Sequence, residues 1–207
     1  MDFPGSLNIH YEHFIQYCLD ITKSLAYHGF KKIILVNGHG SNHNLVDMVA
    51  RRTIVETDAS CVFCSWWQLL KVNPDFDKQW RESVFPGGCS HAGELETSML
   101  MHIDPDSVRT DKVKSEIART NKRGSKFVWT DLFAKGAMGL IEWTSQYSDS
   151  GVMGEAEKAT AEKGRIVFEE VTSNLAEFID EYYDMEIETP SRRQDKEPTF
   201  PLSFPTD

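Results

Sequence analysis

A short apolar segment that ends in a glycine-rich loop restricts the fold of this chain more than any other feature. Residues 32–36 read Lys-Ile-Ile-Leu-Val, and the loop Asn-Gly-His-Gly-Ser-Asn follows at residues 37–42. A continuous run of aliphatic and β-branched residues is typical of a strand buried on both faces of a parallel sheet. A helical pattern over residues 45–54 and a second apolar strand at residues 61–67 follow the loop. Strand, helix and strand at this spacing form a βαβ unit and predict the α/β class.

Further helical patterns surround this unit. Apolar residues recur at intervals of three and four along residues 14–25, which predicts a first helix that ends at Gly29. The same periodicity predicts a shorter helix at residues 94–102 and a long last helix over residues 155–183. Residues 112–150 mix charge, glycine and aromatic residues, so we expect a long, partly extended excursion there.

Composition restricts the partners and the compartment. The 207-residue chain carries a net charge of −10, which disfavours nucleic acids and anionic membranes, because both require a basic surface. It has no bilayer-spanning apolar stretch, and its four irregularly spaced cysteines favour the cytoplasm over an oxidising compartment. Residues 188–207 hold four of the eight prolines and a charge run, so we expect an extended or disordered tail there, after one domain at residues 1–187.

The loop at residues 37–42 is the first candidate site, because ligands bind outside the carboxyl ends of parallel strands. Asn37, Gly40 and Ser41 are candidate substrate contacts, and His39 brings a group that binds metal or moves protons. Two alternatives stay open. His39 can simply cap the following helix, and the loop can cradle a phosphate, although it lacks the third glycine or the lysine of the usual phosphate loops.

The second candidate is the segment Ser-His-Ala-Gly-Glu-Leu-Glu at residues 90–96. On the first turn of a helix His91 and Glu94 would share a face and could converge on one ion, and their side chains are ligand types of hydrolytic Zn²⁺ or Mn²⁺ sites. The structural alternative is a helix start with Ser90 as N-cap and the carboxylates stabilised by the helix dipole.

In combination these motifs resemble the creatininase (creatinine amidohydrolase) family. The resemblance rests on the loop at residues 37–42 and on His-Ala-Gly-Glu-Leu-Glu-Thr-Ser at residues 91–98. It is extended by Phe-Pro-Gly-Ser at residues 3–6, His-Gly-Phe at residues 28–30 and Ala-Thr-Ala-Glu-Lys-Gly at residues 159–164. The resemblance runs to about residue 180 and implies a three-layer α/β/α domain with a parallel sheet, assembled as a homo-oligomer.

The resemblance also implies a role for each matched residue. His39 would bind a divalent metal, Zn or Mn, and Glu94 would be a further ligand, because Ser41 stands where creatininase itself has a carboxylate ligand. His91 would act catalytically by giving a proton to the leaving group, and Glu96 would orient a ligand imidazole. The implied reaction is metal-assisted hydrolysis of a small cyclic amide or cyclic ketone, with metal-bound hydroxide attacking the carbonyl.

Several interpretations remain beside this one. Trp66 or Trp67 would correspond to a substrate-covering tryptophan, but aromatic residues in a strand also belong to cores. Cys61 and Cys64 have the spacing of a metal or redox pair and otherwise pack in the core. Cys89 is a candidate thiol nucleophile without an evident partner.

The resemblance also implies an earlier strand and loop that carry a glutamate, a histidine and an aspartate as ligands. The sequence begins after them, so we expect an N-terminally truncated domain that binds metal weakly. The rival to a hydrolase is therefore an inactive chain that only binds a ligand or serves assembly.

Overall fold

The computed structural model describes residues 2–188 and divides the chain into two compact units. We call residues 9–66 and 176–188 the βαβ unit, and residues 2–8 and 67–175 the pocket unit. The last helix, α6 (Ala161–Asp184), contributes residues to both units. The tail predicted at residues 188–207 lies outside the described residues, except for its first position.

The βαβ unit confirms the predicted α/β class. It contains α1 (Tyr11–Tyr27), β1 (Lys32–Asn37), α2 (His43–Glu56) and β2 (Ser60–Ser65). β1 and β2 are parallel and in register from the pair Lys32 and Ser60 to the pair Asn37 and Ser65. The strand predicted at residues 61–67 is wrong at its end, because the chain turns into a 3-10 helix at Trp66.

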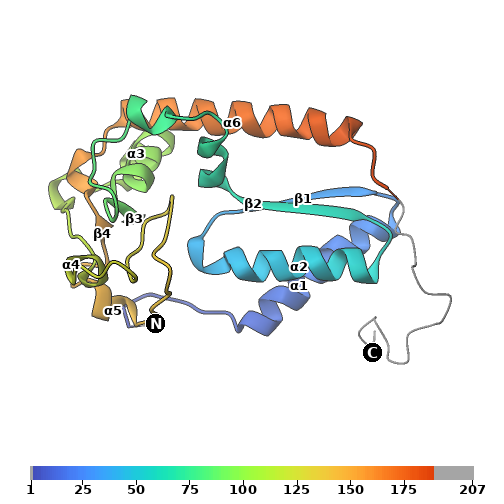
Figure 1. The fold of residues 1–207 in the computed structure, drawn as a ribbon, viewed down its shortest axis with the longest axis horizontal. Coiled ribbons are helices and arrows are strands. Elements are labelled where there is room, and N and C mark those ends of the chain that lie inside the picture. Colours follow the sequence, from blue (N-terminus) through green and yellow to red (C-terminus); the bar gives the residue numbers. More distant parts are fainter. Residues whose placement is uncertain (1, 189–207) are drawn as a thin grey trace. The chain divides into compact units, whose positions relative to one another are not determined.

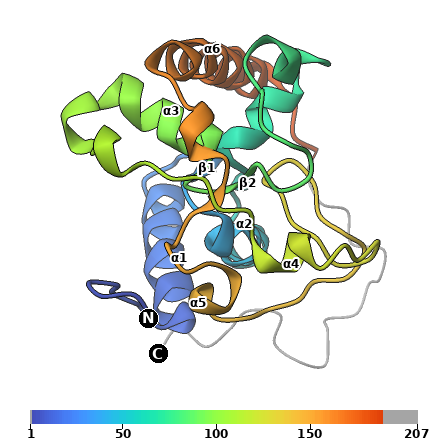
Figure 2. The same cartoon turned by 90° about the vertical axis from the view of Figure 1, so that its left-hand side faces the viewer.

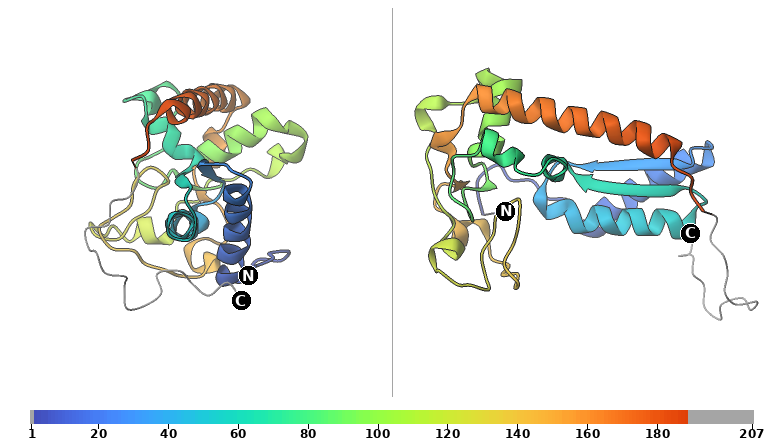
Figure 3. Two further views of the ribbon diagram at one scale, coloured as in Figure 1. Left: turned by 90° about the vertical axis from the view of Figure 1, so that its right-hand side faces the viewer. Right: turned by 45° about the horizontal axis from the view of Figure 1, so that its top comes forward.

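Helices cover both faces of this small parallel sheet (Figure 1). α1 and α2 pack on each other on one face, where the buried hydroxyl groups of Thr22 and Thr53 lie 2.8 Å apart. The last turns of α6 lie on the other face, as Figure 3 also shows, and the Tyr182 hydroxyl donates to Ser60 Oγ over 2.7 Å. The βαβ unit therefore has the three α/β/α layers that the resemblance implies.

The pocket unit is built around a small antiparallel pair of strands. β3 (Cys89–His91) pairs with β4 (Met153–Gly154), and α3 (Glu94–Ile103) follows β3 directly. The start of α6 approaches α3 closely, because a Cβ atom on Gly164 would lie 1.9 Å from the carbonyl oxygen of Ser98 (Figure 2). The glycine of the sequence Ala-Thr-Ala-Glu-Lys-Gly is thus required by packing.

Short elements complete the described chain. The expected excursion at residues 112–150 contains two helices of one turn, and the last helix begins at Ala161 rather than at residue 155. Among the residues that the structure describes, no helix combines the length and the apolar character needed to cross a membrane. The short helices are α4 (Arg119–Lys122) and α5 (Thr144–Tyr147), with 3-10 turns at Gly40–Asn42, Trp66–Lys71, Phe76–Gln79, Pro105–Ser107, Thr110–Lys112 and Ala156–Lys158.

Candidate active site

A tight turn between β3 and α3 positions the first candidate residues. His91 is the last residue of β3, Ala92 has a φ of 47°, and Gly93 is the N-cap of α3. The prediction that His91 and Glu94 share a helical turn is therefore wrong, as is the prediction that Ser90 caps the helix. Ser90 instead donates its hydroxyl to the Thr130 carbonyl over 3.0 Å.

Side chains from the first turn of α3 hold Ala92 in its left-handed conformation. The Ala92 N–H donates to Glu96 Oε2 over 2.6 Å, and the Thr97 hydroxyl donates to the Ala92 carbonyl over 3.1 Å. A left-handed alanine is unfavourable by about 1–2 kcal/mol, so both contacts offset a real strain. Such strain concentrates at functional sites, and here it fixes the backbone next to His91.

Glu94 lies in a different environment from Glu96, although the two are only two positions apart. Its side chain is fully buried, and its carboxylate accepts from the backbone N–H groups of Glu82 and Ser83 over 2.7 to 3.1 Å. Lys163 Nζ lies 2.5 Å from Glu94 Oε1. Burial alone would raise the pKa of Glu94, but these hydrogen bonds outweigh it and hold the pKa below its usual value.

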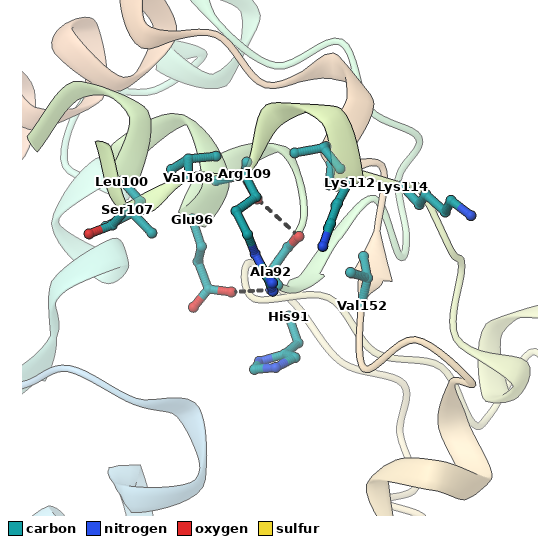
Figure 4. Close-up of a pocket in the computed structure, with 13 residues that line it drawn as sticks. His91, Ala92, Glu96, Leu100, Ser107, Val108, Arg109, Lys112, Lys114 and Val152 are labelled. Carbon is teal, nitrogen blue, oxygen red and sulfur yellow. Dashed lines mark hydrogen bonds between the residues drawn. The ribbon is translucent and has the colours of Figure 1, made fainter. Parts of the chain in front are cut away.

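A cavity of about 410 Å³ opens beside the Ala92 turn (Figure 4). His91, Glu96 and Thr97 line it together with the segment after α3, which contributes Arg109 and Lys112. The volume is within the range of about 300–1,000 Å³ that is typical of small-molecule sites. The structure thus brings the two predicted catalytic residues, His91 and Glu96, to one cavity.

The second candidate region, the loop at residues 37–42, lies in the βαβ unit. The buried Asn37 shapes it, since its side-chain nitrogen donates to the His39 carbonyl over 2.7 Å and to Ser65 Oγ over 2.8 Å. Gly40 and Ser41 are exposed, and the Ser41 N–H donates to His39 Nδ1 over 3.3 Å. His39 is the N-cap of the 3-10 turn Gly40–Asn42, in line with the alternative that it caps the element after the loop.

The remaining predicted site residues differ in burial and lie in different units. Trp67 is buried in the core, whereas Trp66 is half-buried. His39 and Glu94 belong to different units. Across residues 2–188, no three or more histidine, cysteine, aspartate or glutamate side chains form a group that could hold a metal ion.

Burial determines the chemistry of two of the cysteines. Cys89 is buried, and burial raises the pKa of its thiol to about 11, so it is protonated near neutral pH. Burial likewise raises the pKa of Cys61 to about 11. Thiolate chemistry is therefore disfavoured at both positions.

Three residues that contact the candidate site or line its cavity were not predicted from the sequence. Lys163 pairs with Glu94, and its place in the stretch at residues 159–164 was a usable signal. Arg109 and Lys112 line the cavity, yet they stand in a mixed charged segment with no motif around them.

Comparison with known proteins places these features in a family. A sequence model of the creatininase family, described as creatinine amidohydrolase, matches residues 1–179. The chain is 28% identical over 166 residues to the mycofactocin precursor peptide peptidase of Mycobacterium tuberculosis. The matched region covers 80% of this chain and 54% of that protein. It is 25% identical over 187 residues to the creatinine amidohydrolase of Pseudomonas putida, covering 87% of this chain and 67% of that protein.

Solved structures are similar over a comparable range. A creatininase described as "Creatininase Mn" and a mutant creatininase of "Zn-Zn type" each superpose with a TM-score of 0.68 at 26% identity, covering 89% of this chain and 69% of theirs. The chain thus spans about half the length of the mycobacterial relatives that it matches.

Proposed function

The chain belongs to the creatininase family. We propose that it acts as a hydrolase that opens a small cyclic amide or cyclic ketone. The observation that carries the proposal is the cavity of about 410 Å³ that His91 and Glu96 line together. A hydrolase of this kind needs a proton donor beside the bond that breaks, and imidazole is the side chain most often used for this purpose.

His91 is assigned the proton transfer. It lies at the end of β3 and lines the cavity, where it gives a proton to the nitrogen or carbon that leaves when water has added to the carbonyl. Glu96 is a positioning residue, because its carboxylate holds the Ala92 N–H and with it the backbone next to His91. Proton transfer depends steeply on geometry, so this support matters for the rate.

The metal requirement fits the described residues only in part. The solved relatives described as "Zn-Zn type" and "Creatininase Mn" support a divalent Zn or Mn ion for the functional protein. Of this chain's own candidates, His39 is exposed, but the carboxylate of Glu94 is held by the Lys163 ammonium, whose positive charge opposes a second cation. A catalytic zinc normally takes three ligands from protein, and the described residues hold no such group.

The described residues therefore do not make a complete metal centre by themselves. We assign to them the proton transfer, the positioning and the binding of substrate.

A second candidate function is an inactive chain that binds a ligand in the same cavity or serves assembly. The observation that favours it is the same ion pair between Glu94 and Lys163, because it engages the carboxylate that was predicted as the second metal ligand. The two functions differ in one respect, namely whether the bond beside the carbonyl of a cyclic amide or cyclic ketone is hydrolysed.

Elemental analysis combined with a hydrolysis screen tests the proposal. The purified chain is expected to hold Zn or Mn weakly and to hydrolyse creatinine-like cyclic amides or a short peptide only when excess metal is supplied. Tightly held, stoichiometric metal would contradict the incomplete centre. Absence of hydrolysis at saturating metal, in the chain and in an N-terminally extended form, would favour the inactive alternative.

Two further expectations remain predictions, one from the family resemblance and one from the composition. Assembly as a homo-oligomer is checked by light scattering of the purified chain. A cytoplasmic location is checked by fractionating cells that express the tagged protein.

A further inference from the structure

The cavity beside His91 has a basic side that the hydrolase proposal does not use. Arg109, Lys112 and Lys114 all line it, and all three are exposed. Within residues 2–188, none of their side chains makes an ion pair or a hydrogen bond with another residue. Arg165, in the same unit, differs in that it forms ion pairs with Glu162 and Glu169.

The three cations differ in direction. In Figure 4 the side chains of Arg109 and Lys112 run from the segment after α3 toward Ala92, whereas Lys114 points away. Two unpaired cations therefore face the turn that carries His91. Glu96 lines the same cavity and contributes one negative charge.

From this arrangement we propose that Arg109 and Lys112 bind a carboxylate of the substrate, and that the cavity selects amides that carry this group. The inference rests on the proposed function in placing the reacting bond at His91. Two inward cations and one inward carboxylate leave a net charge of about +1, which matches a monoanion better than a dianionic phosphate. Arginine adds a planar donor pair that fits both oxygens of a carboxylate.

Binding of matched acid and amide probes tests the inference without requiring hydrolysis. The probes are acetylglycine and acetylglycinamide, which differ only in the carboxylate, and the readout is the NMR shift of the His91 ring, assigned with His91→Gln. The wild-type chain is expected to bind the acid about fivefold more tightly than the amide. This ratio corresponds to the upper end of the usual free energies of exposed ion pairs. The preference is expected to weaken as salt is raised.

Variants locate the binding site. Arg109→Met and Lys112→Met are each expected to reduce the acid preference toward unity, whereas Lys114→Met, which removes the same charge from the same segment, is expected to retain it. Equal binding of acid and amide by the wild type would overturn the inference. So would an equal loss in Lys114→Met, or tighter binding of inorganic phosphate than of acetylglycine.

Two further comparisons show whether the carboxylate belongs to a peptide or to a small acid, and which of the two proposals fails. Triglycine and its C-terminal amide show whether a peptide carboxyl terminus is recognised as well as a small acid. If acid preference is present but neither a cyclic amide nor a cyclic ketone is hydrolysed, the proposed function fails and the carboxylate site stands. If hydrolysis occurs without acid preference, the carboxylate site fails and the function stands.

Discussion

The two sides of α3 show how differently one motif can be used. On the closed side, Glu94 is fully buried and shares its charge with Lys163 and with two backbone N–H groups. On the open side, Glu96 lines the cavity, and one of its carboxylate oxygens accepts a hydrogen bond from the Ala92 N–H. The two acids are separated by one residue, yet one ties helices together and the other positions the site.

The role of a carboxylate in a recognised motif is therefore decided by the charged groups that surround its side chain. A buried carboxylate opposite an ammonium is already compensated and has little reason to attract a second cation. A half-exposed carboxylate beside an open cavity keeps an oxygen available for other contacts. Variants on each side of α3 therefore test whether the two carboxylates have these different roles.

The largest expected effect is on the closed side. Lys163→Met leaves the buried Glu94 carboxylate without its cation, which should lower the free energy of unfolding by about 3 kcal/mol. Urea denaturation measures this loss. Lys158→Met is the matched control, because Lys158 pairs with Glu155 at a more exposed position and should cost less than about 1 kcal/mol.

Equal losses in these two lysine variants would show that Glu94 is not a closed structural carboxylate. A gain in metal affinity in Lys163→Met would sharpen the comparison, since it would mean that the ammonium is what keeps a cation away from Glu94. Adding Glu94→Gln to Lys163→Met should recover part of the lost stability, because the uncompensated charge is then gone.

On the open side the expected effect is mainly on rate. Glu96→Ala removes the acceptor of the Ala92 N–H and should reduce hydrolysis about 10- to 100-fold through displacement of His91. Glu96→Gln keeps an oxygen at this position and should lose less. Steady-state rates with the same substrate measure both variants, and a larger loss in Glu96→Gln than in Glu96→Ala would contradict a positioning role.

The smallest effect concerns a second carboxylate that organises a loop in the pocket unit. The Ser150 hydroxyl, together with the backbone N–H groups of Asp149 and Ser150, lowers the pKa of Glu116 from 4.5 to about 2. Because the folded pKa is depressed, the stabilisation is complete above pH 4.5 and is lost as the pH falls toward about 2. Hydrogen exchange at residues 148–151 should therefore accelerate over this pH range.

Glu116→Gln is the control for this titration. In this variant, hydrogen exchange at residues 148–151 should already be fast at neutral pH. Position 116 no longer titrates, so it should contribute no further acceleration between pH 4.5 and 2. If the variant and the wild type accelerated alike on acidification, another group would control the loop.

Much of the fold could be predicted from the sequence, because hydrophobic periodicity and the βαβ spacing are local signals. The strand at residues 32–36 and the helix at residues 94–102 are observed nearly at the predicted positions. The error at Trp66 and Trp67 has a physical reason, since an apolar run does not mark where a strand ends and a buried 3-10 turn begins.

The candidate site could be predicted only in part. The motif identified His91 and Glu96, which line one cavity. Spacing placed His91 and Glu94 on one helical turn, but the left-handed Ala92 and the extended Gly93 separate them. The pairing of Lys163 with Glu94 joins positions 69 residues apart, and such a contact has no local signature.

The most direct test of the account is the hydrolysis rate of His91→Gln compared with that of His102→Gln, measured on folded protein at equal metal content. His102 lies on the same helical segment as Glu94 and packs on Phe168, so it is a matched histidine outside the cavity. We expect His91→Gln to lose about 10²- to 10⁴-fold in rate, whereas His102→Gln stays close to wild type. Wild-type rates in His91→Gln would contradict the assignment of the cavity as the active site.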